Sequence, residues 1–239
     1  MDLLWQGFKE AIRLVMTLDP EVMGVTLLSL RVSGLATLIS LVLGMPLGVF
    51  LALREFRGRH LALGAVNTGM GLPPVVVGLF VVLFLWRSGP LGFLELLYTP
   101  TAMVIAQVVI AFPIVAGLTA AAIQQLDPRI GLQAKALGAS GFQTVMTLVM
   151  EARLPLLAAV MAGFGGVISE VGAVMMVGGN LKGITRVLTT ATVMEVRMGR
   201  FATAIALGLI LLGLTFAVNL GLTMLQQGRR RQWSHRPSR

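Results

Sequence analysis

The chain has 239 residues, of which 56% are hydrophobic and only 12% charged, with a formal net charge of +9 and no cysteine. Soluble domains are about a quarter charged, so this composition excludes an ordinary soluble domain. The lack of cysteine excludes disulfides and thiolate metal sites. Five of the nineteen basic residues lie in the last eleven positions. This clustering is typical of topology signals beside anionic lipid, rather than of a nucleic-acid-binding surface.

Residues 1–24 form an N-terminal segment with the pattern of an amphipathic helix. Its apolar residues recur at helical spacing around the charged residues Lys9, Glu10 and Arg13, and they are Leu3, Leu4, Phe8, Ile12 and Met16. Such a pattern predicts a helix that lies in the membrane interface. The pair Asp19-Pro20 predicts its end. The alternative, a sixth and poor membrane-spanning helix, stays open.

Five apolar segments are long enough to cross a bilayer, since about 20 residues span its hydrocarbon core. We expect these spans at residues 26–53, 61–86, 101–126, 154–178 and 201–226. Together they predict an all-α, polytopic membrane protein with one transmembrane domain over residues 25–228. A polar loop at residues 127–153 divides the third span from the fourth, and a basic tail follows at residues 229–239.

Prolines and glycines inside the spans predict close packing or breaks. Gly44 and Gly48 form a G-x-x-x-G face on which another helix can pack closely. Residues 71–74 predict an interruption of the second span, and Pro113 predicts one in the third. Backbone groups freed by such breaks must face other helices or a water-filled path. Packing alone explains each case, but their recurrence favours a moving, pore-forming bundle.

Basic residues are unequally divided between the two sides of the membrane. With the N-terminus outside, the inner segments hold eleven Lys and Arg residues and the outer segments hold seven, with Arg31 unassigned. Because basic residues favour the cytoplasmic side, we expect an external N-terminus and a cytoplasmic C-terminus.

The central polar loop contains a helix start and a helix stop. Asp127-Pro128 has the chemistry of an N-cap followed by a first helical residue, and Gly138 that of a helix end. A helix of two to three turns is marginal alone and needs a partner surface. A simple connector and a docking element both fit this pattern.

Several short motifs resemble those of permeases of ABC importers. Ala134-x-x-Leu137-Gly138-Ala139, followed by Leu154-Pro155, resembles the cytoplasmic loop of that family. In this chain Leu132 stands where the family has Glu, and Gln133 where it has Ala. Two further segments resemble permeases for molybdate, sulfate and tungstate, namely residues 72–79 (LPPVVVGL) and residues 169–180 (SEVGAVMMVGGN). Residues 88–92, 98–102 and 151–153 look most like the tungstate permease group.

The resemblance implies a type I ABC importer permease core, like that of molybdate and methionine permeases, in a bacterial or archaeal plasma membrane. It implies import of an oxyanion, tungstate first, by alternating access, with molybdate or sulfate as alternatives. The implied partners are two copies of an ATP-binding subunit, an extracytoplasmic oxyanion-binding protein, a second copy of this chain, and membrane lipids. The chain has no Gly-Lys pair and so no phosphate loop. We therefore expect a non-catalytic subunit without a cofactor or metal site.

The residues expected to act fall into three groups. Those that contact the ATP-binding subunit are Gln133, Ala134, Lys135, Leu137, Gly138, Ala139 and Ser140. Those of a gate or pathway are Pro73, Pro74, Glu170 and Gly172. Those that meet the anion or its binding protein outside are Asn180, Lys182, Thr185 and Arg186.

Glu170 is the only acidic residue inside an expected span, where an ionised carboxylate is costly and usually functional. A carboxylate repels an oxyanion, so we expect it to brace or gate rather than bind substrate. The residues expected to meet the anion outside, from Asn180 to Arg186, would also fit an anchor at the membrane interface.

Two other classes of protein fit less well. A stand-alone secondary transporter usually has inverted repeats and several intramembrane charges for coupling. A membrane-embedded enzyme would carry paired catalytic groups in its spans. The expected spans supply neither.

Overall fold

A computed structural model describes residues 2–233, and the regular elements in that range are helical, which confirms the all-α fold class. In chain order they are α1 (Asp2–Met16), α2 (Pro20–Leu53), α3 (Arg59–Met70), α4 (Pro74–Leu85), the short 3-10 helix η1 (Gly92–Leu94), α5 (Pro100–Gln124), α6 (Pro128–Ala136), α7 (Gly141–Glu151), α8 (Arg153–Ile168), α9 (Gly172–Gly178), α10 (Leu188–Arg197) and α11 (Phe201–Trp233).

Three helices are long and apolar enough to cross a membrane, namely α2, α5 and the described part of α11 up to Met224. Two bent pairs bring the number of candidate spans to five: α3 with α4, bent by 102°, and α7 with α8, bent by 69°. The second expected span is therefore two helices. Pro73 disfavours a helical residue before it, and Pro74 occupies the first position of α4, so the chain breaks at residues 71–73.

Two expectations about the other spans are wrong. The third span is not interrupted at Pro113, because α5 runs unbroken from Pro100 to Gln124. Pro113 is buried against α3, where a Cβ added to Gly69 would lie 2.8 Å from the Cβ of Pro113. The fourth span is not continuous, because α8 ends at Ile168 and α9 begins at Gly172.

The centre of the molecule is the packing of α2 against α5. A Cβ on Gly48 would lie 2.6 Å from the Cβ of Thr119, and a Cβ on Gly44 would lie 3.1 Å from the carbonyl oxygen of Phe112. Both values are tighter than ordinary contact, so the two backbones approach through the predicted G-x-x-x-G face. Small residues of α5, such as Ala106, and of α2, such as Ala36, are fully buried nearby.

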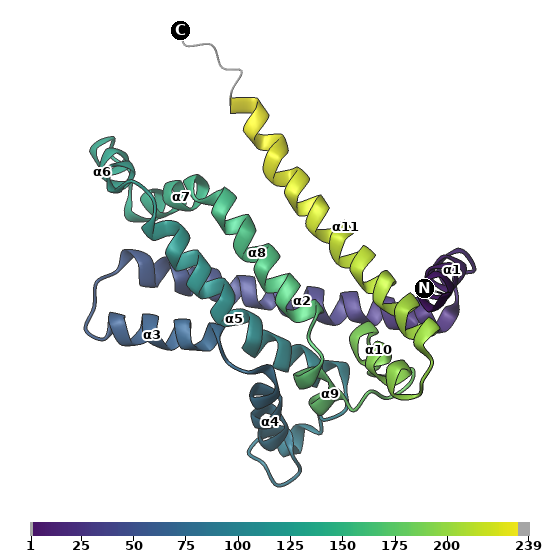
Figure 1. The fold of residues 1–239 in the computed structure, drawn as a ribbon. Coiled ribbons are helices and arrows are strands. Elements are labelled where there is room, and N and C mark those ends of the chain that lie inside the picture. Colours follow the sequence, from purple (N-terminus) through teal and green to yellow (C-terminus); the bar gives the residue numbers. More distant parts are fainter. Residues whose placement is uncertain (1, 234–239) are drawn as a thin grey trace.

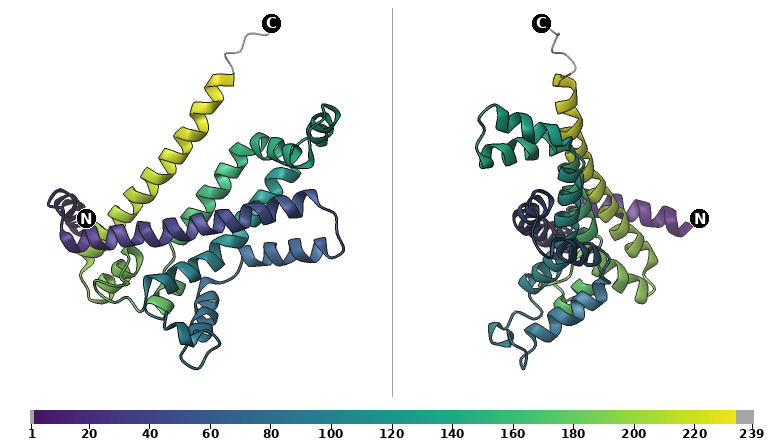
Figure 2. Two further views of the ribbon diagram at one scale, coloured as in Figure 1. Left: turned by 180° about the vertical axis from the view of Figure 1, so that it is seen from behind. Right: turned by 90° about the vertical axis from the view of Figure 1, so that its left-hand side faces the viewer.

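The helices define two ends of the molecule (Figure 1). The α6–α7 segment, the turn between α2 and α3, and the far end of α11 lie toward one end, which we call the loop end. The opposite end holds α1, α4, α9 and α10, and Figure 2 shows α6 and α7 standing out sideways from the body.

The N-terminal segment forms the helix that its pattern predicts. α1 buries Gly7 and Ala11 against α11, whereas Leu4, Trp5 and Phe8 are exposed. The exposed apolar face suits an interfacial position. At the other terminus, α11 continues past residue 228, through Trp233, and residues 234–239 of the expected tail lie outside the described part.

Candidate functional site

The central polar loop is a hairpin of two helices, α6 and α7, with both ends of α6 fixed by local hydrogen bonds. Asp127 caps its start, since Oδ1 accepts from the amide of Arg129 at 2.9 Å. Its end is a Schellman motif: Gly138 has φ +84°, its amide donates to the carbonyl of Lys135 at 2.9 Å, and the amide of Ala139 donates to that of Ala134 at 3.0 Å. Both predicted ends are confirmed.

The second helix of the hairpin begins with a capping box. Ser140 Oγ accepts from the amide of Gln143 at 3.3 Å, and Gln143 Oε1 accepts from the amide of Ser140 at 2.8 Å. At Gly131, α6 lies against the buried Thr144 and Leu148 of α7, at a distance where an added Cβ would make only ordinary contact. The turn at residues 137–140 therefore has a defined shape.

The hairpin exposes large apolar side chains at the loop end. Leu132 is 66% exposed, Leu137 89% and Phe142 74%. Among the residues expected to contact an ATP-binding subunit, two are half-buried, Ala134 and Ala139, and five are exposed, namely Gln133, Lys135, Leu137, Gly138 and Ser140. An exposed apolar patch rimmed by polar residues is typical of a protein-binding surface.

The two breaks in the spans meet, and they bring the expected gate residues together. Pro73 and Pro74 begin α4, which packs against α9. A Cβ on Gly172 would lie 2.8 Å from Cγ2 of Val75, and one on Gly78 would lie 2.7 Å from Cα of Ala173. A side chain at either position would push the two short helices apart.

Glu170 lies in the break between α8 and α9 and is half-buried. Its Oε1 accepts from the amide of Ala173 at 2.9 Å, so the carboxylate caps the first turn of α9. Its own carbonyl oxygen accepts from Oγ1 of Thr189 at 2.9 Å, which ties the break to α10. The partner of the carboxylate is thus a backbone donor.

Sequence reasoning missed a buried amide beside this break. Gln107 of α5 is 3% exposed, and its Nε2 donates at 2.9 Å to the carbonyl of Val167, in the last turn of α8. A carbonyl there lacks the usual partner within the helix, and besides Gln107 it accepts from the amide of Glu170 at 3.2 Å, just past the end of α8. The available signal was that Gln107 is the one amide side chain between Asn67 and Gln124.

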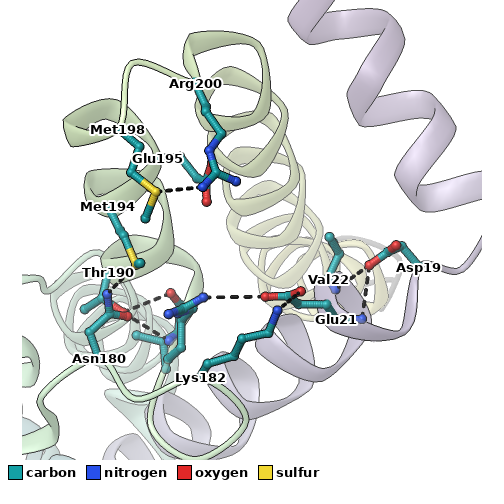
Figure 3. A network of polar contacts seen from close by, with 12 residues as sticks. Asp19, Glu21, Val22, Asn180, Lys182, Thr190, Met194, Glu195, Met198 and Arg200 are labelled. Atoms are coloured by element: carbon teal, nitrogen blue, oxygen red, sulfur yellow. Dashed lines mark hydrogen bonds and ion pairs between the residues drawn. The ribbon is translucent and has the colours of Figure 1, made fainter.

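At the opposite end, an ion-pair cluster joins the start of α2 to the segment after α9 (Figure 3). Lys182 Nζ lies 2.6 Å from Oε2 of Glu21, and Arg186 Nη1 lies 3.5 Å from its Oε1. The side chain of Arg186 is only 13% exposed. Sequence reasoning missed Glu21, because an acid in the first turn of a helix is explained by the helix dipole alone.

The other two residues expected at this end hold the turn in shape. Thr185 is buried, and its Oγ1 donates to the carbonyl of Gly178 at 2.5 Å and accepts from the amide of Leu181 at 2.9 Å. Asn180 has φ +53°, and its Nδ2 donates to Sδ of Met194 at 3.4 Å. Lys182 and Arg186 therefore carry the charge that the turn presents.

Comparison with known proteins places these features in one context. The model of a family described as "Binding-protein-dependent transport system inner membrane component" matches residues 44–231. The tungstate uptake system permease protein TupB of Peptoclostridium acidaminophilum is 43% identical over 227 residues, which are 95% of this chain and 100% of that protein. TupB of Campylobacter jejuni subsp. jejuni is 34% identical over 219 residues, 92% of each protein.

Among solved structures, the MetNI methionine ABC transporter in inward-facing conformations shares the fold. The TM-score is 0.70 at 17% identity, over 87% of this chain and 95% of that chain. The range matched by the family model contains both helix breaks and the α6–α7 hairpin.

Proposed function

The chain belongs to the family of binding-protein-dependent transport system inner membrane components, and on that premise we infer that it is the transmembrane permease subunit of an ATP-driven ABC importer for tungstate. The observation that supports tungstate as the substrate is the 43% identity to a tungstate uptake permease over 95% of the chain. The fold supports the same conclusion, since its described helices match those of an ABC importer permease.

The α6–α7 hairpin is the surface that we assign to the ATP-binding subunit. Its exposed Leu137 and Phe142 offer apolar side chains to a partner, and Lys135 offers a positive charge. The chain has no phosphate loop, so ATP is bound and hydrolysed by the partner, of which we propose two copies. The capped ends of both helices let the hairpin transmit a push without collapsing.

In our proposal a second copy of this chain completes the transport pathway. The chain has at most five candidate spans among its described residues, and these are too few to enclose a pathway that opens to each side of the membrane in turn. We assign the moving part to the two breaks that pack together, which contain Pro73, Pro74, Glu170 and Gly172. Breaks between helices absorb changes in backbone angles when packed elements shift. In this proposal ATP binding closes the two partner subunits on each other, and the hairpins carry that motion to the breaks.

The end opposite the hairpin faces outward in our proposal, with the N-terminus outside and the C-terminus in the cytoplasm. Lys182 and Arg186 there attract an anion released by an extracytoplasmic binding protein, since clustered charge raises the local concentration of an oppositely charged substrate. Asn180 and Thr185 support them by fixing the turn.

Elemental mass spectrometry of cells at nanomolar supply of each anion, with and without this chain, tests the function. Loss of tungsten alone upon deletion is the expected result. Loss of molybdenum or sulfur instead would move the substrate and leave the mechanism. No change in any of the three elements would refute oxyanion import.

A further inference from the structure

We propose that a hollow beside the start of α2 is an outer binding site for a tetrahedral oxyanion, in which Arg31, Lys182 and Arg186 hold the anion and Glu21 competes with it. The proposal rests on the function proposed above, and it adds a defined site to it. Arg31 and Glu21 thereby acquire a role that neither local sequence pattern predicts.

The hollow has a volume of about 480 Å³ and lies between α2 and the segment after α9. Its charged lining residues are Glu21, Arg31, Lys182 and Arg186, so its net charge is +2. This value matches the charge of a tungstate dianion. The other seven lining residues are uncharged, namely Pro20, Gly24, Val25, Leu27, Leu28, Gly183 and Ile184.

A second hollow, of about 400 Å³, lies on the other side of the Glu21 ion pairs. The two hollows share Glu21, Val25, Lys182 and Arg186, so these residues form the wall between them. The charged residues around the second hollow are Glu10, Asp19, Glu21, Glu195, Lys182, Arg186 and Arg200, which gives a net charge of −1. Since that balance repels an anion, we assign the oxyanion to the first hollow.

Arg31 is exposed on α2, and residues 32–53 after it carry no charge. Those 22 residues rise about 33 Å, enough to cross the hydrocarbon core, which puts Arg31 at its outer boundary. An arginine facing lipid at that depth is costly, so it needs water or a partner. Among the side chains described, those of residues 2–224, it has no ion-pair partner, and the hollow is the place where it meets other charges.

The contact of Glu21 with the two cations can be exchanged at low cost. Lys182 is 67% exposed and Glu21 49% exposed, and pairs this exposed contribute little to stability. Arg186 is largely buried, and its Nε has no hydrogen-bond acceptor among the described residues. An oxyanion can accept from Nε and an Nη of one guanidinium together, which is a strong geometry. Because this Nε is itself buried, an oxyanion in the hollow can accept from it only after the side chain of Arg186 turns toward the hollow.

Gly24 lines the hollow between Glu21 and Arg31, and a Cβ added to it would meet no atom within 4 Å. Gly24→Leu therefore adds an apolar side chain at the lining of the hollow without removing a charge, and its Cβ meets no clash. Gly34 lies on the same helix and is equally open, so Gly34→Leu is a matched control.

The test measures tungstate binding to the purified permease–ATPase complex in phosphatidylcholine nanodiscs, by equilibrium dialysis and elemental mass spectrometry, without binding protein. We expect Arg31→Gln and Gly24→Leu to weaken binding about tenfold, because a charged donor or the space itself is lost. We expect Glu21→Gln to strengthen it, and Gly34→Leu to leave it unchanged. Purified yield and thermal midpoint of each complex show whether a variant has lost its fold.

Opposite effects of Glu21→Gln and Arg31→Gln separate this site from a structural ion pair. If the pairs only hold the fold, Glu21→Gln and Lys182→Gln lower the thermal midpoint alike, Arg31→Gln has no effect on binding, and the proposal is wrong.

A lipid phosphate could supply the same oxyanion chemistry. Tungstate binding that disappears in phosphatidylglycerol nanodiscs would identify the ligand as a lipid headgroup and overturn the substrate site. Normal cellular tungsten uptake with unchanged Arg31→Gln binding would remove this inference alone, whereas absent uptake by the unaltered chain would remove the proposed function.

Discussion

Gly138 is the residue on which the shape of the hairpin most directly depends. Its φ of +84° is reached easily only by glycine, and asparagine tolerates it better than other residues. We predict that Gly138→Ala strains the turn by about 1 kcal/mol and lowers tungsten uptake severalfold at unchanged membrane abundance, while Gly138→Asn keeps most of the uptake. Uptake by elemental mass spectrometry and abundance by immunoblot are the measurements.

Gly141, three residues further on, is the control for this change. It has no positive φ, and a Cβ there would meet nothing within 4 Å. Gly141→Ala should therefore leave uptake unchanged. Equal loss in the two alanine variants would mean that the turn does not depend on the left-handed residue.

Gly78 is the residue at which the crossing of α4 and α9 is closest. A Cβ there would lie 2.7 Å from the backbone of Ala173, so Gly78→Ala must move a helix. We predict a loss of stability of about 1–3 kcal/mol, as for other overpacked contacts, seen as a lower thermal midpoint in detergent. Gly165→Ala, in α8 with open space around its Cβ, should keep the midpoint of the unaltered chain. An unchanged midpoint for Gly78→Ala would show that the two helices separate without cost.

At the scale of helices, the sequence predicts those helix ends that are determined by hydrogen bonds between nearby residues. The start of α6 at Asp127 and its end at Gly138 follow from groups no more than five residues apart. Pro73 and Pro113 show the limit of such rules. The segment that contains Pro73 breaks a span, whereas Pro113 lies inside the continuous helix α5. The difference lies in the packing of Pro113 against Gly69, which is a tertiary contact.

The same limit explains why the ion pairs of Glu21 and the capping amide of Gln107 were missed. Glu21 meets Lys182 across 161 positions, and Gln107 meets Val167 across 60 positions. No periodicity or motif in one sequence links residues that far apart. The fold class, the break at residues 71–73 and helix α6 were thus predictable, whereas α7 and the break between α8 and α9 were not.

Gln107 binds the last turn of α8, so its removal should lower the stability of the fold. We predict that Gln107→Leu lowers stability by about 1 kcal/mol, because the carbonyl of Val167 loses its side-chain donor and keeps the amide of Glu170 at 3.2 Å. The thermal midpoint of the purified complex measures this. Gln124→Leu, an exposed change on the same helix, serves as the control and should shift stability by less than about 0.5 kcal/mol. Equal midpoints in both variants would show that the amide of Glu170 is donor enough for this carbonyl.

At the scale of the molecule, the two ends differ in chemistry as well as in position. The loop end carries the α6–α7 hairpin with its exposed apolar side chains, and the opposite end carries the charged hollows around Glu21. One end therefore suits a protein that binds ATP, and the other suits contact with an anion. Tungstate import requires that these ends lie on different sides of one membrane, which ties the two proposals to a single orientation.

That orientation can be tested cleanly because the chain has no cysteine. We predict that a single cysteine replacing Ser140, in the exposed turn of the hairpin, reacts with a membrane-impermeant maleimide only after the membrane is opened. A cysteine replacing Lys182 should react in intact cells, since that side chain is 67% exposed at the opposite end. The basis is twofold: ATP is cytoplasmic, and the excess of basic residues in short loops lies on the hairpin side. Labelling of both sites in intact cells would point to leaky membranes, which a cytoplasmic marker protein detects. The reverse pattern with that marker protected would place the hairpin outside and remove its role as the ATPase contact.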